Sequence, residues 1–181
     1  ITITGLTNGT TYTFTVTATN AIGTSIFSAP TNSVTPATTP DAPVIGTAFL
    51  GNGEATITFT PPANNGGSAI TSYTVTSNPG GLTASGGSSP IIITGLTNGT
   101  TYTFTVTATN AIGASIASAA SNSVVPTSVP FAPTIGTATA GNGEAIITFT
   151  PPANNGGSAI TSYTVTSSPG GLTASGGSSP I

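Results

Sequence analysis

The chain has 181 residues, only 2% of them charged, and its formal net charge of -3 at pH 7 comes from three acidic side chains. It contains no Lys, Arg, His, Cys, Met or Trp. A chain without cations cannot neutralise phosphates, which excludes nucleic-acid binding and argues against an anionic membrane surface as partner. A chain without cysteine has no disulfide and no thiol chemistry.

The chain is a tandem repeat with a period of ninety residues. Residues 4–20 and 94–110 are identical, and the blocks 1–90 and 91–180 align without a gap and differ at 15 positions. Most of the differences fall between residues 24 and 50. We therefore expect a section of a longer array, in which each repeat is one small domain. Pairing of partial repeats between chains is the less favoured interpretation.

In chain order, residues 1–36 are expected to be the C-terminal part of a first repeat, and residues 37–42 a Pro-rich linker. A complete domain is predicted over 43–126. Apolar residues there alternate with threonine, most clearly in TYTFTVTATN at 101–110, and this period of two is typical of half-buried strands. With Gly-rich turns between them, strands are expected at about 43–50, 54–60, 69–77, 81–85, 90–94, 101–110 and 115–125.

A second Pro-rich linker is predicted at 127–132, before the N-terminal part of a third repeat at 133–181. The prolines of both linkers fix the backbone in an extended form, so they should act as short, stiff connectors. The pattern predicts an all-β fold of tandem antiparallel β-sandwiches, with one complete domain flanked by two partial ones.

Four stretches carry a family resemblance. They are AP at 42–43, ITFTPP at 57–62, SYTV at 72–75 and LTNGTTYTFTVTATN at 96–110. Together they resemble the fibronectin type III domains found in tandem in bacterial secreted and surface proteins.

The resemblance implies that Tyr102 is the corner tyrosine, with its hydroxyl bound to backbone and its ring in the core, and that Tyr12 is its copy. The chain departs from the family pattern at two places in each repeat. Tryptophan is usual where this chain has Phe59 and Phe149, and proline where it has Asn8 and Asn98. These departures keep another immunoglobulin-like sandwich open.

The three acidic residues do not indicate an active site. Glu54 and Glu144 occupy the same repeat position, while Asp41 is replaced by Phe131 in the other copy. Without a His or Lys there is no general base for a catalytic triad. We expect no catalytic residue, no cofactor and no metal cage, although a calcium site assisted by carbonyl groups stays open.

Asn8 and Asn98 begin Asn-Gly-Thr triplets that fit the N-glycan acceptor pattern. Asn-Gly is also the residue pair that a tight corner prefers. The turn is the favoured interpretation, and a glycan at these two residues is the alternative.

Large apolar residues appear where the copies differ. Phe27, Phe49 and Leu50 align with Ala117, Thr139 and Ala140, and Phe131 aligns with Asp41. A core position would not exchange phenylalanine for a small residue without a cost of about 3 kcal/mol or more. These four residues are therefore candidates for contacts between neighbouring domains or chains, and neutral drift is the alternative.

These observations predict a structural repeat region of an extracellular fibre, stalk or sheath protein, whose repeats assemble with copies of themselves into a filament. The alternative is a spacer or adhesive module of a secreted or cell-surface protein, in contact with cell-surface polysaccharide. An ice-binding threonine array is less favoured, because sandwich sheets twist. An extracellular location is expected because the chain lacks Lys and Arg, and with them every trypsin cleavage site.

Overall fold

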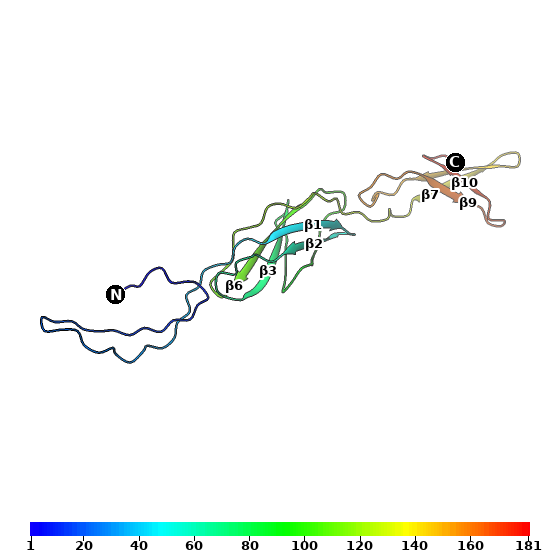
Figure 1. Ribbon diagram of the computed structural model, residues 1–181. Coiled ribbons are helices and arrows are strands. Elements are labelled where there is room, and N and C mark those ends of the chain that lie inside the picture. The colour runs from blue at the N-terminus through cyan, green and yellow to red at the C-terminus, as the bar shows by residue number, and fades with distance from the viewer.

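The computed structural model describes residues 1–181 and contains strands but no helix. Its repeats lie end to end in an elongated molecule (Figure 1). The ten strands are β1 (Val44–Leu50), β2 (Glu54–Thr60), β3 (Ile70–Asn78), β4 (Thr83–Gly86), β5 (Ile91–Thr94), β6 (Thr103–Asn110), β7 (Thr134–Ala140), β8 (Ala145–Thr150), β9 (Tyr163–Thr166) and β10 (Thr173–Gly176). The prediction of an all-β chain with antiparallel sheets is confirmed.

Two three-stranded sheets face each other in the complete repeat. One has the order β1-β2-β5 and the other the order β4-β3-β6, with every neighbouring pair antiparallel. The burial of β6 alternates strictly, with Phe104, Val106 and Ala108 inside and the threonines between them partly exposed. The period of two read from the sequence therefore places the correct face of each strand in the core.

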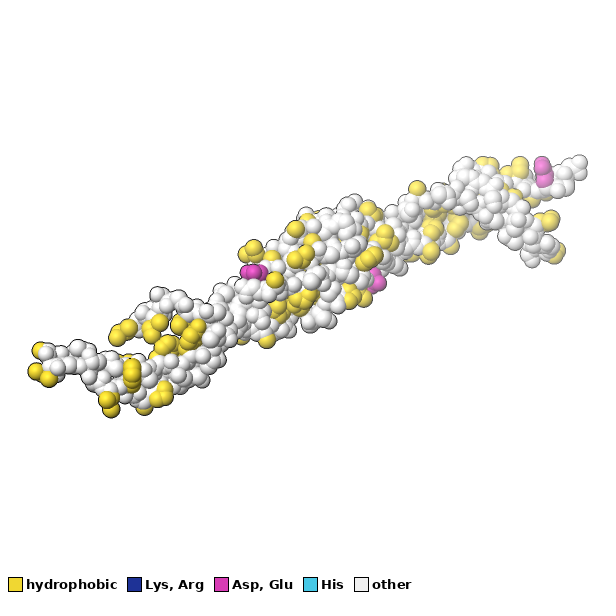
Figure 2. Space-filling view, in the orientation of Figure 1, with side chains coloured by type: hydrophobic (Ala, Val, Ile, Leu, Met, Phe, Trp, Pro, Cys, Tyr) yellow, Lys and Arg dark blue, Asp and Glu magenta, His cyan; other side chains and the backbone are white.

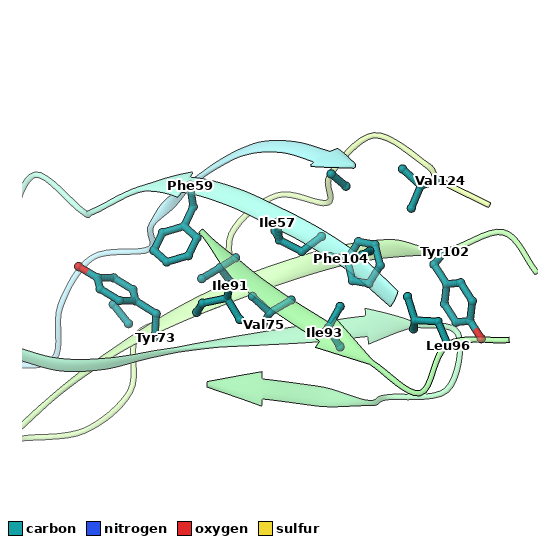
Figure 3. Packing of buried hydrophobic residues seen from close by; sticks show 14 residues of the cluster. Ile57, Phe59, Tyr73, Val75, Ile91, Ile93, Leu96, Tyr102, Phe104 and Val124 are labelled. Atoms are coloured by element: carbon teal, nitrogen blue, oxygen red, sulfur yellow. The ribbon is translucent and has the colours of Figure 1, made fainter. Parts of the chain in front are cut away.

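The core of the complete domain lies between these sheets (Figure 3). Phe104 is fully buried near its centre, and the rings of Phe59 and Tyr73 pack with their centroids 4.8 Å apart. Burial of side chains of this size contributes about 1.5–3 kcal/mol each. The buried apolar cluster comprises Ala48, Ala55, Ile57, Phe59, Tyr73, Val75, Ile91, Ile93, Leu96, Tyr102, Phe104, Val106, Ala108 and Val124.

Tyr102 forms the corner that the sequence predicts. Its ring is buried, and its hydroxyl oxygen accepts a hydrogen bond from the backbone N–H of Thr97 at 3.2 Å. The copy in the first repeat repeats this bond, since Tyr12 accepts from the N–H of Thr7 at 3.0 Å, and the bond lowers the pKa of Tyr12. The corner is therefore set by local sequence, because it forms in both copies.

Residues 113–125 lie beside β6 but form no regular strand, so the strand predicted at 115–125 is wrong. Every third residue of this segment meets every second residue of β6. In each pair the serine N–H donates to the β6 carbonyl at 2.7–2.9 Å, and the serine hydroxyl accepts from the same residue's N–H at 3.0 Å. The pairs are Ser115 with Ala108, Ser118 with Val106, and Ser121 with Phe104.

We call this arrangement the hydroxyl ladder. Each hydroxyl replaces a backbone carbonyl that a normal strand would offer, so the two residues between successive serines bulge outward. The first repeat forms the same ladder with Ser25, Ser28 and Thr31. The segment also covers the edge of the other sheet, because the amide of Asn122 accepts from the N–H of Ala48 and donates to its carbonyl.

Replacing Ser115 by alanine should destabilise the complete domain by about 1–3 kcal/mol, because the buried N–H of Ala108 would lose its acceptor. Urea unfolding followed by tyrosine fluorescence measures the change. Ser123→Ala is the matched control, since Ser123 is exposed in the same segment and its hydroxyl makes no hydrogen bond within the chain. Equal losses of unfolding free energy in the two variants would show that the Ser115 hydroxyl does not stabilise the domain through its bond to Ala108.

The flanking parts form only some of the expected strands. β7 and β8 repeat the register and the irregularity of β1 and β2. In residues 1–36, by contrast, the expected strands appear only as single bridges, such as Tyr12 with Val34. The prediction of regular strands is wrong there. This segment pairs with no equivalent of β3, and a two-stranded ribbon alone is only marginally stable.

Candidate functional site: the junction between repeats

The three carboxylates do not form a site. No group of three or more His, Cys, Asp or Glu residues that could hold a metal lies together in residues 1–181. On the face shown in Figure 2, the few acidic side chains lie apart from one another and apolar side chains are scattered over all the repeats. The chain contains no helix that could cross a membrane. A structural feature that recurs along the chain and joins its repeats is the junction between one repeat and the next.

The backbone of the connecting segment is bonded to both of the repeats that it joins. On the preceding side, the carbonyl of Pro126 accepts from the N–H of Gly99 at 2.9 Å, and the N–H of Thr127 donates to Gly51 at 3.1 Å. On the following side, Ser128 donates to Gly156 at 2.7 Å and Phe131 to Asn154 at 3.0 Å. Thr127 and Ser128 are adjacent, so no free residue separates the two attachments.

The first junction repeats three of these four bonds, and the bond of Thr127 has no counterpart there. The carbonyl of Pro36 accepts from Gly9 at 2.9 Å, while Thr38 donates to Gly66 at 2.8 Å and Asp41 donates to Asn64 at 3.0 Å. These bonds use backbone atoms, so Asp41 and Phe131 fill the same role despite their different side chains. The predicted linkers 37–42 and 127–132 thus contain residues that are fixed to the following repeat, while the domain bounds given above stay predictions.

Direct contact between the repeats is made by glycine on glycine. The corner Asn98-Gly99 of one repeat meets the loop 154–157 of the next, and a Cβ on Gly99 would lie 3.2 Å from the Cα of Gly157. A Cβ on Gly157 would overlap the backbone nitrogen of Gly99. Gly9 and Gly67 form the same contact at the first junction, at 3.1 Å. A side chain at any of these positions would force the two backbones apart.

A buried amide anchors the connecting segment to the complete domain. Asn110, at the end of β6, is 4% exposed, and its side-chain nitrogen donates to the carbonyls of Thr38 at 2.8 Å and Asn65 at 2.9 Å. Its side-chain oxygen accepts from Ile112 and Gly113. One side chain therefore joins the connecting segment, the loop at the junction and the sandwich. In the sequence Asn110 has the features of an ordinary turn residue, so this role could not be predicted.

The predicted glycan acceptors lie in the two corners. Asn98 accepts from the N–H of Gly53 at 2.8 Å and donates from its amide nitrogen to Asn52 at 2.9 Å, so both polar atoms of its side chain are used within the domain. Asn8 lies at the equivalent corner of the first repeat and is exposed. Glycosylation of either residue stays a prediction.

The four apolar candidates for contact lie at the surface. Phe27, Phe49, Leu50 and Phe131 are 74%, 54%, 59% and 66% exposed, so none is buried against a neighbouring repeat of this chain. Phe27 lies in an outward bulge of the hydroxyl ladder, where its side chain is free to vary. Contact of these residues with another chain stays a prediction.

A comparison with protein families assigns the complete repeat. Residues 42–124 match the family model described as fibronectin type III domain. This stretch is a fibronectin type III domain. The sheet orders β1-β2-β5 and β4-β3-β6 and the corner at Tyr102 belong to that domain. A fibronectin type III domain is a non-catalytic module, although it also occurs within larger enzymes.

The chain spans only part of the length of the proteins that it resembles. A Kelch domain-containing protein of Saccharolobus solfataricus is 34% identical over 117 residues, covering 62% of this chain and 16% of that protein. Among solved structures, a crystal structure of titin domains is 27% identical, with a TM-score of 0.48, covering 61% of this chain and 39% of that one. The twitchin kinase region from C. elegans is 27% identical, with a TM-score of 0.45, covering 51% and 18%.

Proposed function

We propose that the chain is a structural repeat region of an extracellular protein, in which each fibronectin type III repeat docks on the next and the array sets a distance. The observation that carries this proposal is the second junction, where Thr127 is bonded to the preceding repeat and Ser128 to the following one, without a free residue between them. A connector bonded in this way transmits orientation, whereas a flexible linker does not.

Two further observations support a spacing role. The match to the Kelch domain-containing protein covers 16% of that chain, an arrangement expected for a module within a larger protein. The chain also lacks the residues that catalysis needs, because it contains no Lys, Arg, His or Cys and its acids lie apart. The extracellular location is proposed from the same composition, since a chain without Lys or Arg resists trypsin-like proteases.

Self-assembly into a filament is a second proposed property, favoured by the exposed aromatic residues Phe49 and Phe131 on a nearly uncharged surface. Proteins with little net charge associate readily, and exposed apolar groups favour contact between molecules. Sedimentation velocity of the chain and of a Phe49→Ala, Phe131→Ala double variant tests it. Monomers at all concentrations would contradict self-assembly and leave a spacer.

Electron microscopy of native material labelled with an antibody against the repeat tests the main proposal. We expect label on extended structures outside the cell, with an axial period that corresponds to one or two domains. Label confined to the cell interior would contradict the extracellular assignment, and label on compact particles would contradict an extended array.

A further inference from the structure

Asparagine followed by glycine recurs three times in the complete repeat, at 52–53, 65–66 and 98–99. In such a pair the glycine nitrogen can attack the side-chain carbonyl carbon of asparagine. The N–H proton is lost, ammonia leaves and a cyclic imide forms. Water then opens the imide at either carbonyl and gives aspartate or isoaspartate. The reaction needs only water, and asparagine is thermolabile in proteins for this reason.

In the complete domain, each glycine N–H that would act as the nucleophile is bonded elsewhere. Gly53 donates to the side chain of Asn98 at 2.8 Å, Gly66 to the side chain of Asn64 at 2.9 Å, and Gly99 to the carbonyl of Pro126 at 2.9 Å. A nitrogen held in this way must break its hydrogen bond and turn before it can reach the preceding amide carbon. Imide formation therefore requires a local opening of the structure.

Two of these Asn-Gly pairs, 52–53 and 98–99, are hydrogen-bonded to each other. Asn98 accepts from the N–H of Gly53 through its side-chain oxygen, and its amide nitrogen donates to the side-chain oxygen of Asn52 at 2.9 Å. The Asn98 side chain thus holds the nitrogen of Gly53, which is the nucleophile of the pair, and fixes the orientation of the Asn52 side chain. The same corner makes the glycine contact with the next repeat through Gly99.

We propose that Asn52-Gly53 is an imide-forming modification site, and that the Asn98 side chain keeps it unreactive. Loss of the Asn98 side chain would release the N–H of Gly53 and the side chain of Asn52 together, and so allow the two groups that react to approach each other.

The Asn98→Ala variant isolates this restraint. The change removes the acceptor of the Gly53 N–H and the donor to the Asn52 side chain, and it leaves the sequence of the hairpin 51–54 unaltered. Aged at mildly alkaline pH, the folded variant should lose ammonia at Asn52 roughly fivefold or more faster than the unsubstituted chain.

Chymotryptic peptides and mass spectrometry measure the rates, since the chain offers no site for trypsin. Asn8→Ala, the same change at the corner of the first repeat, should leave the Asn52 rate unaltered. Asn65, whose side chain is held separately by Gly67, reports global unfolding. Equal rates at Asn52 in the unsubstituted chain and in the Asn98→Ala variant would overturn the proposal. A rise at Asn65 that matches the rise at Asn52 would do the same.

Discussion

Replacing Gly157 by alanine should uncouple the third repeat from the complete domain. The new Cβ would overlap the nitrogen of Gly99 and lie 2.8 Å from the carbonyl carbon of Asn98, so the loop must leave the corner. The variant should behave in small-angle X-ray scattering as a hinged molecule with a smaller mean extension, and lose the hydrogen bond from Ser128 to Gly156, worth about 0.5–1.5 kcal/mol.

Gly171→Ala is the matched control for this variant. Gly157 and Gly171 both have left-handed backbone angles, +83° and +62°, so alanine costs about 1–2 kcal/mol of backbone strain at either position. A Cβ on Gly171 meets no atom within 4 Å. The control should therefore keep the scattering profile of the unsubstituted chain. Identical profiles for the two alanine variants would show that the glycine contact does not fix the orientation.

Phe104→Ala should destabilise the complete domain by about 3–5 kcal/mol, the cost of deleting a large buried side chain and leaving a cavity. The ring is 0% exposed and lies among the residues of both sheets (Figure 3). Since small domains have about 5–15 kcal/mol of stability in total, this single change removes a large part of it. Thermal or urea unfolding measures the loss.

Phe49→Ala makes the same chemical change on the outer face of the same sandwich. Phe49 is 54% exposed and pairs across the strands with Thr56, outside the core. Its loss should change stability by about 0.5 kcal/mol or less. If Phe49→Ala lowers the free energy of unfolding as much as Phe104→Ala does, the assignment of Phe104 to the core and of Phe49 to the outer face is wrong.

The strands could be predicted from the sequence because their signal is local. Alternation of threonine with apolar residues gave β2 with its observed bounds, Glu54–Thr60, and placed Phe104 and Val106 in the core. Tyr102 was assigned to the corner through a resemblance, and its bond to Thr97 spans five residues. Each of these features depends on neighbours in the chain, so pattern and structure agree.

The hydroxyl ladder could not be predicted from a period-two alternation, because its bonded residues recur with a period of three. The signal is present in the sequence as Ser115, Ser118 and Ser121, three residues apart. It becomes meaningful only when the serine side chain is counted as an acceptor that replaces a backbone carbonyl. Thr31 replaces serine at the last position in the first repeat and keeps the hydroxyl, while the residues between the rungs vary.

The junction could not be predicted because it joins segments that are far apart in the chain. Gly99 and Gly157 each read as an ordinary turn glycine, and only the structure brings their backbones together. The junction also explains why the copies differ where they do. Thr38 and Ser128 act through their backbone N–H groups, so their side chains are free to change.

A distance between equivalent points of consecutive repeats tests the central claim most directly. Ser85 and Ser175 are exposed and occupy the same repeat position, and the chain has no native cysteine, so a Ser85→Cys, Ser175→Cys variant can be labelled cleanly with spin probes. Docked repeats predict one narrow distance distribution in double electron–electron resonance. A broad distribution, of the kind that a flexible linker produces, would contradict the account.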